Sequence, residues 1–415
     1  MTEIKVVDAI CGAGKTTWVF EYMRQNKDKR WLFVSPYLSE TGDGKTKGRI
    51  QEELPGLNFK SPTAAPNKTE SFKRLAANGH NIAITHSLFH SFSMEIAELL
   101  EQNEYHLVVD ETLDLISVYD DIEKQDVICL IKANMVVKQP NGQLAWNHTE
   151  YPNYSGRDTV IKDMCDTQAL WLHGENVLIQ RVPPTIIKSC KSCTILTYMF
   201  EGSLMRCWFE LNDLKYQHYY PDTLRSEQEI KEVISGLLKI VKPTKYVMDL
   251  QLDSQGMPLK NIFSANWYKN NKADEAVFKR IKASMVTQLQ EHMSKGKTFW
   301  TTFKAFKSKL EGKGYTRAVK GVEPFVPKNM RASNEYAEFT NCLYAVNVYP
   351  DMTLVNHLAQ FGIQVDKDGY ALSEMIQFLF RGSIRQHKEM YILILSNRMR
   401  KLLEDYLLSK PSDCK

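Results

Sequence analysis

The chain has 415 residues, a length that suits two domains of about 200 residues each rather than one core. Its hydrophobic content of 43% and charged content of 25% are those of an ordinary globular protein, which excludes a disordered chain. A net charge of +4 is mild, so any basic surface must come from local clustering of lysine and arginine.

The first residues, MTEIKVVDAI, do not have the pattern of a signal peptide, and we find no apolar stretch long enough to cross a bilayer. We therefore expect a protein without membrane association. Eight scattered cysteines favour a reducing cytoplasm. The close pair Cys190 and Cys193 lacks the second pair that a zinc site needs, which favours two buried residues beside a strand.

The pattern Gly-x-Gly-Lys-Thr occurs twice near the start, in CGAGKTT (Cys11–Thr17) and in TGDGKTK (Thr41–Lys47). A phosphate-binding loop needs a buried strand before it and a helix after it, because backbone N–H groups and the helix dipole then converge on the anion. The first copy follows the β-branched run IKVVDAI and precedes TTWVFEYMRQ, which has helical spacing. The second copy follows a strand that Pro36 interrupts, and it precedes a segment with room for only a short helix. The first copy is therefore predicted to be the phosphate loop, and the second a solvated connector.

Within the predicted phosphate loop, Lys15 is expected to reach the β- and γ-phosphates of a nucleotide, and the Thr16 hydroxyl to bind Mg²⁺. The backbone amides of the loop would form a nest for the anion. They belong to Gly12, Ala13, Gly14, Lys15, Thr16 and Thr17.

A carboxylate pair follows another apolar run, YHLVVDET, about a hundred residues downstream. Asp110 is predicted to hold the Mg²⁺ shell, and Glu111 to polarise the attacking water. The alternative is that the two acids cap a following helix in DETLDLI. Their position after a phosphate loop favours the catalytic interpretation.

Near the other end, ALSEMIQFLFRGSIRQHKEMYILIL predicts a helix followed by a buried strand. Gln377, Arg381 and Arg385 are spaced four apart, so they are expected to line one face of that helix. The ordinary interpretation of such arginines is an exposed face with salt bridges.

These three elements together resemble the motifs of a known enzyme class. Ala9-x-x-Gly12-x-Gly14-Lys15-Thr16 is similar to motif I of helicase superfamilies 1 and 2, and Asp110 with Glu111 to motif II. The C-terminal helix resembles motif VI of superfamily 2, whose arginines act on the γ-phosphate from a second domain. The combined pattern looks like the compact DEAD-like helicases of bacteriophages, which implies ATP and Mg²⁺ as cofactors.

The resemblance extends to segments that contact nucleic acid or couple it to hydrolysis. FVSPYLSE looks like motif Ia, CTILTYMFEGS like motif III, GKTFWTTFKAF like motif IV, and NMRASNEY like motif V. The loop after motif Ia faces nucleic acid in this family. The residues that the resemblance assigns to these roles are Lys45, Arg49, Thr85, Thr197, Arg331 and Asn334.

Alternating strands and helices predict α/β domains with parallel sheets. With the resemblance, this implies two RecA-like P-loop domains in tandem, residues 1–205 and 206–410, with ATP in the cleft between them and a tail at 411–415. Residues 114–190 exceed the usual link between motifs II and III, and Asn141-Gly142 predicts a hairpin turn there. This segment is either an inserted strand-separating or partner-binding element, or a disordered surface excursion.

Residues 279–320 contain eleven Lys or Arg against two Asp or Glu, with aromatics between them. Lysines that neutralise phosphates and aromatics that stack on bases suit a single-stranded track. The alternative, favoured for the aromatics, is that they are core residues of the motif IV region.

The expected function is an ATP-dependent translocase or helicase on a single-stranded or forked nucleic acid, with DNA favoured over RNA. Replication or recombination proteins are expected partners, and the host bacterial cytoplasm is the expected location. One alternative is a P-loop ATPase that remodels or inhibits a host nucleic-acid complex without unwinding. Another is a packaging or nuclease-coupled ATPase, for which no acidic metal cluster is evident in the second half.

Overall fold

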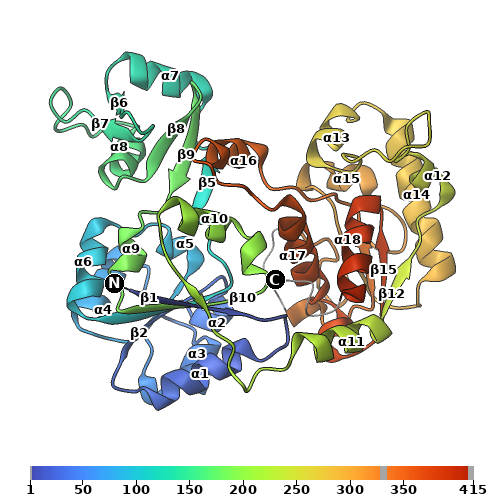
Figure 1. Cartoon of the computed structure of the whole chain (residues 1–415), viewed down its shortest axis with the longest axis horizontal. Coiled ribbons are helices and arrows are strands. Elements are labelled where there is room, and N and C mark those ends of the chain that lie inside the picture. The colour runs from blue at the N-terminus through green and yellow to red at the C-terminus, as the bar shows by residue number, and fades with distance from the viewer. Residues whose placement is uncertain (1, 328–333, 410–415) are drawn as a thin grey trace. The chain divides into compact units, whose positions relative to one another are not determined.

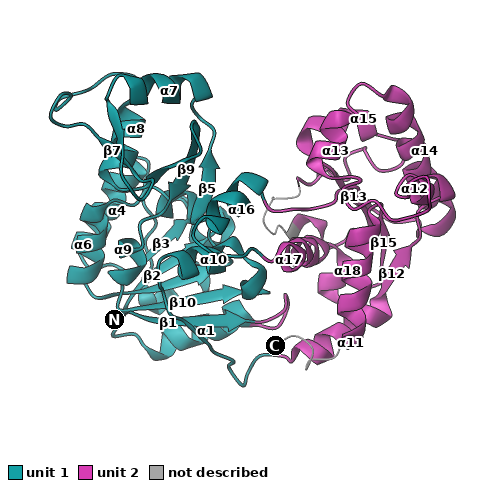
Figure 2. Cartoon of the chain, turned by 45° about the horizontal axis from the view of Figure 1, so that its top comes forward, with its two compact units in different colours: residues 1–8, 15–224, 351–365 teal, residues 9–14, 225–350, 366–415 magenta. Residues whose placement is uncertain are grey.

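The computed structural model describes residues 2–327 and 334–409 of the chain (Figure 1). They group into two compact units, drawn in two colours in Figure 2. Unit 1 comprises Met1–Asp8, Lys15–Leu224 and Asp351–Val365, and unit 2 comprises Ala9–Gly14, Arg225–Pro350 and Asp366–Lys415.

Strand pairing and packing explain where unit 1 ends. Strand β11 (Gln217–His218) pairs with β1 (Glu3–Asp8), so the chain remains in unit 1 as far as Leu224, past the boundary expected near residue 205. Helix α16 (Met352–Ala359) then returns to unit 1, because its apolar side chains are buried in the core of that unit.

The main sheet of unit 1 has six strands in the order β11-β1-β10-β4-β2-β3, and every neighbouring pair is parallel. Parallel strands need crossover connections, which the intervening helices supply. The strand register places Asp8 opposite Thr197 and Asp110 opposite Leu196, so these residues lie at the carboxyl edge of the sheet. The remaining bounds are β2 (Arg30–Ser35), β3 (Ile82–Thr85), β4 (Tyr105–Asp110) and β10 (Ser192–Thr197).

Both faces of this sheet are covered. Adjacent residues of β1 illustrate the arrangement, because Val6 packs in one hydrophobic cluster and Val7 in the other. Helices α1 and α3 pack in the cluster of Val7, and α4, α6 and α10 in that of Val6. The helices of unit 1 outside its inserted part are α1 (Lys15–Gln25), α2 (Leu38–Thr41), α3 (Arg49–Glu53), η1 (Pro55–Leu57), α4 (Lys68–Ala77), α5 (His86–Phe89), α6 (Met94–Gln102), α9 (Thr185–Lys188), η2 (Phe200–Gly202), α10 (Leu204–Leu211) and α16.

The segment between β4 and β10 is a folded insertion with its own hydrophobic core. It contains a three-stranded antiparallel sheet, β5-β9-β8, and the hairpin β6-β7. The hairpin turns at Asn141-Gly142, as predicted, and Gly142 has the positive φ of 89° that such a turn favours. The alternative of a disordered excursion is wrong. The bounds are β5 (Ile116–Tyr119), α7 (Lys124–Lys132), β6 (Val136–Lys138), β7 (Leu144–Trp146), α8 (Thr159–Asp166), β8 (Leu170–His173) and β9 (Val177–Arg181).

Unit 2 is built on a four-stranded parallel sheet in the order β12-β15-β14-β13. The strands are β12 (Leu238–Val241), β13 (Thr298–Thr301), β14 (Asn341–Tyr344) and β15 (Met390–Ile394). The helices are α11 (Glu227–Leu237), α12 (Lys245–Asp249), α13 (Ala265–Asn270), α14 (Glu275–His292), η3 (Lys304–Phe306), α15 (Lys307–Leu310), η4 (Asn334–Tyr336), α17 (Lys367–Leu379), η5 (Ser383–Gln386) and α18 (Asn397–Leu408).

The aromatic residues of the basic stretch 279–320 are mainly core residues of this unit. Phe299, Trp300, Phe306 and Tyr315 are all buried, which confirms the core interpretation and leaves their rings no surface for stacking on bases. Within the described ranges, no helix is long and apolar enough to span a membrane.

Candidate nucleotide site

The first Gly-x-Gly-Lys-Thr copy has the predicted strand before it and the predicted helix after it. Strand β1 ends at Asp8, and the eleven-residue helix α1 begins at Lys15. Gly12 and Gly14 have φ angles of 83° and 99°, which L side chains rarely adopt, so glycine is required at both positions. Such glycines allow successive backbone N–H groups to face an anion at a helix N-terminus.

In the second copy, two of the loop amides are bonded to an acidic side chain. In the connector between α2 and α3, the Asp43 carboxylate accepts hydrogen bonds from the N–H groups of Lys45 at 2.9 Å and Thr46 at 2.6 Å. These bonds lower the pKa of Asp43, and they use two N–H donors that a phosphate in this loop would need. The helix that follows has only five residues. The geometry therefore favours the first copy as the phosphate loop.

Lys15 is 9% exposed, and its charge acts on two carboxylates of unit 1. These are Asp8, at the end of β1, and Asp110, at the end of β4. In each case the Lys15 ammonium lowers the pKa of the carboxyl and opposes the larger effect of burial. Thr16 is half-buried and Thr17 is exposed in the first turn of α1.

Asp110 is held by two hydrogen bonds from neighbouring elements. The Ser35 hydroxyl, at the end of β2, donates to Asp110 Oδ2 at 3.2 Å. The His86 Nε2 atom lies 2.9 Å from the Asp110 carbonyl oxygen. Burial raises the pKa of the Asp110 carboxyl to about 7, and repulsion from Glu111 and Glu40 adds to the effect. A carboxylate whose charge is disfavoured in this way is suited to receive a cation.

Glu111 follows in the left-handed region, with a φ of 66°, and its N–H donates to the Leu196 carbonyl at 2.8 Å. The chain then continues to strand β5, not to a helix. The alternative that the two acids cap a helix is therefore wrong.

Asp8 is a site residue that the sequence analysis missed. Its carboxylate accepts the N–H groups of Met199 at 2.7 Å and Phe200 at 2.8 Å, directly after β10. It thereby fixes the segment that follows Thr197, the predicted coupling residue. Thr197 is fully buried, and its hydroxyl has no hydrogen-bond partner among the residues that the structure describes. The available signal was an acid that ends a buried strand just before the loop.

The predicted nucleic-acid residues of unit 1 have different surroundings. Lys45 is exposed on the connector, and Thr85 is the last residue of β3. Arg49 is instead engaged in ion pairs, at 2.5 Å with Glu53 and 3.7 Å with Glu40. Glu40 also acts on Asp110, so Arg49 belongs to the charge network around that carboxylate.

The predicted stripe of Gln377, Arg381 and Arg385 on one helix face is wrong. Helix α17 ends at Leu379, and Arg385 is an exposed residue of the separate 3₁₀ helix η5. The chain turns at Gly382, where a Cβ atom would lie 2.5 Å from Met390 Sδ and 2.9 Å from a Phe299 ring carbon. This close packing ends the helix.

The individual residues of that segment and of the predicted motif V lie as follows. Gln377 is on α17 and donates to the Ser373 hydroxyl at 3.3 Å. Arg381 is 4% exposed, with its guanidinium 4.9 Å from the centre of the Phe378 ring. Asn334 begins η4, and Arg331 lies outside the described residues.

Two solved structures of XPD-type proteins are similar to this chain in fold. A structure described as XPD_APO matches with a TM-score of 0.54 and 12% identity, over 98% of this chain and 95% of that chain. The structure of S. tokodaii Xpd4 matches with a TM-score of 0.52 and 13% identity, over 99% of this chain and 95% of that chain. At these identities the likeness shows the fold. It confirms the predicted α/β class with two RecA-like domains.

Family models and a full-length relative identify the sequence family. Residues 116–180 match the YonV middle domain, and residues 238–407 match the YonV C-terminal Rossmann-like domain. The SPbeta prophage-derived uncharacterized protein YonV of Bacillus subtilis (strain 168) is 30% identical over 425 residues, which covers 98% of this chain and 99% of that protein. The chain therefore belongs to the YonV family.

Proposed function

We propose that the chain hydrolyses ATP to move along, or unwind, a single-stranded track of nucleic acid. The observation that carries the proposal is the arrangement at the carboxyl edge of the unit 1 sheet. There, Lys15 follows a glycine-rich loop and acts electrostatically on Asp110, whose pKa is raised to about 7. The motif resemblance and the XPD-type fold support the choice of a helicase-type motor.

The residues present fit a nucleotide with its magnesium ion. Two positive-φ glycines precede the N-terminus of an eleven-residue helix, which suits a polyphosphate. The negative charge of Asp110 is disfavoured by burial and by repulsion from Glu111 and Glu40, so a bound cation would stabilise it. Mg²⁺ binds preferentially to carboxylate and phosphate oxygens, so the Thr16 hydroxyl and Asp110 are the residues that would hold it.

In the proposed reaction, each residue of the chain has a separate task. Lys15 binds the β- and γ-phosphate oxygens, and the loop amides orient them. Glu111 orients the attacking water and accepts its proton. Bound Mg²⁺ supplies charge neutralisation at the phosphates. We also propose catalytic roles for Arg381, Arg385 and Gln377 of unit 2, because their segment resembles motif VI.

Nucleic-acid stimulation of hydrolysis tests the proposal. ATP hydrolysis by the full chain would be measured alone and with single- and double-stranded DNA and RNA. We expect several-fold stimulation by a single strand, and loss of hydrolysis by about a hundredfold in Lys15→Ala. Equal rates with and without every polynucleotide would exclude translocation and favour the alternative of a remodelling ATPase.

Lys45→Ala is the matched control, because it changes the corresponding lysine of the second Gly-x-Gly-Lys-Thr copy. It should weaken polynucleotide binding and leave unstimulated hydrolysis unchanged. If it abolished unstimulated hydrolysis as Lys15→Ala should, the second copy would be the phosphate loop.

A further inference from the structure

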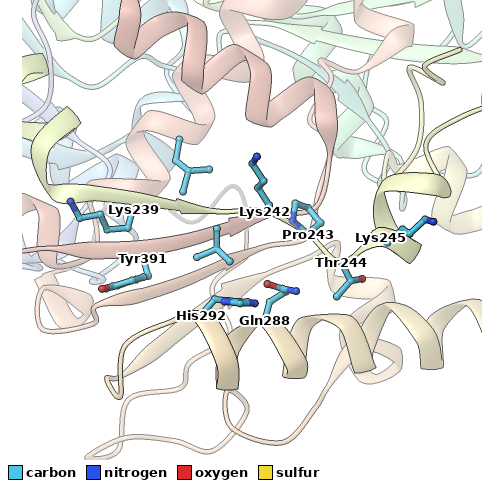
Figure 3. Close-up of a pocket in the computed structure, with 10 residues that line it drawn as sticks. Lys239, Lys242, Pro243, Thr244, Lys245, Gln288, His292 and Tyr391 are labelled. Carbon is cyan, nitrogen blue, oxygen red and sulfur yellow. The ribbon is translucent and has the colours of Figure 1, made fainter. Parts of the chain in front are cut away.

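Strand β12 lies at the edge of the unit 2 sheet and borders a groove of about 570 Å³ (Figure 3). The strand pairs with β15 on one side only, so part of its backbone N–H and C=O groups face outward. The groove is lined by Lys239, Ile240, Val241, Lys242, Pro243, Thr244, Lys245, Gln288, His292 and Tyr391. An unpaired strand edge is a template for another extended chain.

Gln288 is the unusual residue of this groove. It is 7% exposed, and no hydrogen bond links its side-chain amide to any residue that the structure describes. Figure 3 shows Gln288 and His292 projecting from helix α14 toward β12. Its side chain lines the groove, and an amide both donates and accepts hydrogen bonds, so it suits a ligand that does the same.

The charge of the groove is positive. Lys242 and Lys245 are exposed, and neither has an acidic partner within the described part of the chain. Lys239 lies 3.9 Å from Glu389, so its charge is partly neutralised. The uncompensated positive charge of Lys242 and Lys245 therefore lies at the carboxyl end of β12, where it would attract an acidic ligand.

We propose that this groove binds an extended acidic segment of a partner protein, which adds to β12 as a further strand. The outward backbone groups and the Gln288 amide would pair with the backbone of the segment, and Lys242 and Lys245 with its carboxylates. A peptide backbone supplies donors and acceptors in the alternation that a strand edge requires.

The lining residues favour a peptide over a nucleic-acid strand. Single-stranded nucleic acids are bound by stacking of bases on aromatic rings. Among the described residues that line the groove, Tyr391 is the only Phe, Tyr or Trp, and its hydroxyl is hydrogen-bonded to Glu389. Phosphates also accept hydrogen bonds without donating them, so they would leave the outward C=O groups of β12 unpaired.

Peptide binding by the full chain tests the proposal. The probe is a labelled eight-residue peptide of alternating Glu and Val, and its binding would be followed by fluorescence anisotropy. We expect Lys242→Glu with Lys245→Glu to weaken binding about tenfold or more. The matched control is Lys279→Glu with Lys282→Glu, two lysines on another groove beside α14, and it should change binding less than about twofold.

Backbone pairing is tested separately from charge. The same peptide N-methylated at every second residue keeps its carboxylates but cannot donate along one edge, so it should not bind measurably. Gln288→Leu should weaken binding of the unmodified peptide without lowering the melting temperature, because the amide that it removes lines the groove. A merely structural role for Gln288 would lower the melting temperature instead.

Several results would overturn the proposal. They are equal binding of the methylated and unmethylated peptides, equal weakening by the control pair, and full displacement of the peptide by oligo(dT) through Lys242 and Lys245. The proposal is independent of hydrolysis, because Lys15→Ala should bind the peptide as the unmodified chain does.

Discussion

Arg181, at the end of β9, is a buried cation whose neighbours are mainly rings. It is 6% exposed, and its guanidinium lies 3.8 Å from the centre of the Trp171 ring and 4.6 Å from that of Phe361. No acidic partner is found for it in residues 2–327 and 334–409, and burial lowers its pKa to about 9. Its Nη2 atom contacts His357 Nε2 on α16, which requires that imidazole to be neutral.

This contact predicts a loss of stability in mild acid. Burial, with the nearby Arg181 charge, lowers the pKa of His357 from 6.5 to about 3. The unfolded chain therefore binds a proton below pH 6.5 that the folded chain refuses, so the unfolding free energy falls as the pH drops toward 3. The full effect is on the order of 5 kcal/mol. His357→Gln should show a smaller fall in melting temperature between pH 7 and pH 5 than the unmodified chain, and an equal fall would contradict the assignment.

Asp110 gives a pH dependence of the opposite sign. Its folded pKa of about 7 lies above its ordinary value of 3.8, so the ligand-free chain loses stability as the pH rises through 7. In EDTA, Asp110→Asn should therefore stabilise the chain more at pH 8 than at pH 5, as seen in the melting temperature. The gain in unfolding free energy at pH 8 should exceed the gain at pH 5 by an amount on the order of 3 kcal/mol. The unmodified chain should bind Mg²⁺-nucleotide more tightly at pH 8 than at pH 6. A binding constant that is flat with pH would exclude Asp110 as a ligand.

At the scale of elements, the second Gly-x-Gly-Lys-Thr loop depends on a close backbone contact. A Cβ atom on Gly48 would lie 2.3 Å from the Gly42 nitrogen and 2.6 Å from the Glu40 carbonyl group, so the loop closes backbone to backbone. Gly48→Ala must open it and separate Glu40 from Arg49. We expect the free energy of unfolding, measured with urea, to fall by about 1–3 kcal/mol. Gly56→Ala is the control, because its Cβ would meet nothing within 4 Å, and it should be nearly neutral.

Elements that depend on contiguous residues were predictable from the sequence. The strand, loop and helix around Lys15, the strand that ends in Asp110, and the turn at Asn141-Gly142 are each set by a few neighbouring residues. The end of α17 was not predictable, because it depends on packing of Gly382 against Met390 and a side chain of β13.

The same reason explains what the sequence analysis missed in the site. Asp8 bonds to residues about 190 positions away, and the 3.7 Å ion pair of Arg49 with Glu40 depends on the return of the chain from α2 to α3. Neither pairing has a local signal. The fold class was accessible because it needs only the order of strands and helices, and it does not need their side-chain partners.

At the scale of the whole molecule, the insertion can be removed at a natural closing point. Tyr119 of β5 is directly paired with Leu178 of antiparallel β9, so a short turn can join them in place of residues 120–177. Ile116 and Ile179, which belong to the unit 1 core, remain in place. The shortened chain should unfold cooperatively and retain unstimulated ATP hydrolysis, as judged by circular dichroism melting and phosphate release. Loss of hydrolysis in a folded product would show that the insertion is part of the site.

The return of α16 to unit 1 has a consequence for how the protein can be divided. The chain leaves unit 1 after Leu224, re-enters it at Asp351 and leaves again after Val365. A protease cut or a gene break near residue 224 would therefore separate the α16 segment from the core that buries Leu354 and Leu358. Neither half is an exchangeable module, and recombination that swaps one unit between relatives must transfer at least two separate stretches of coding sequence.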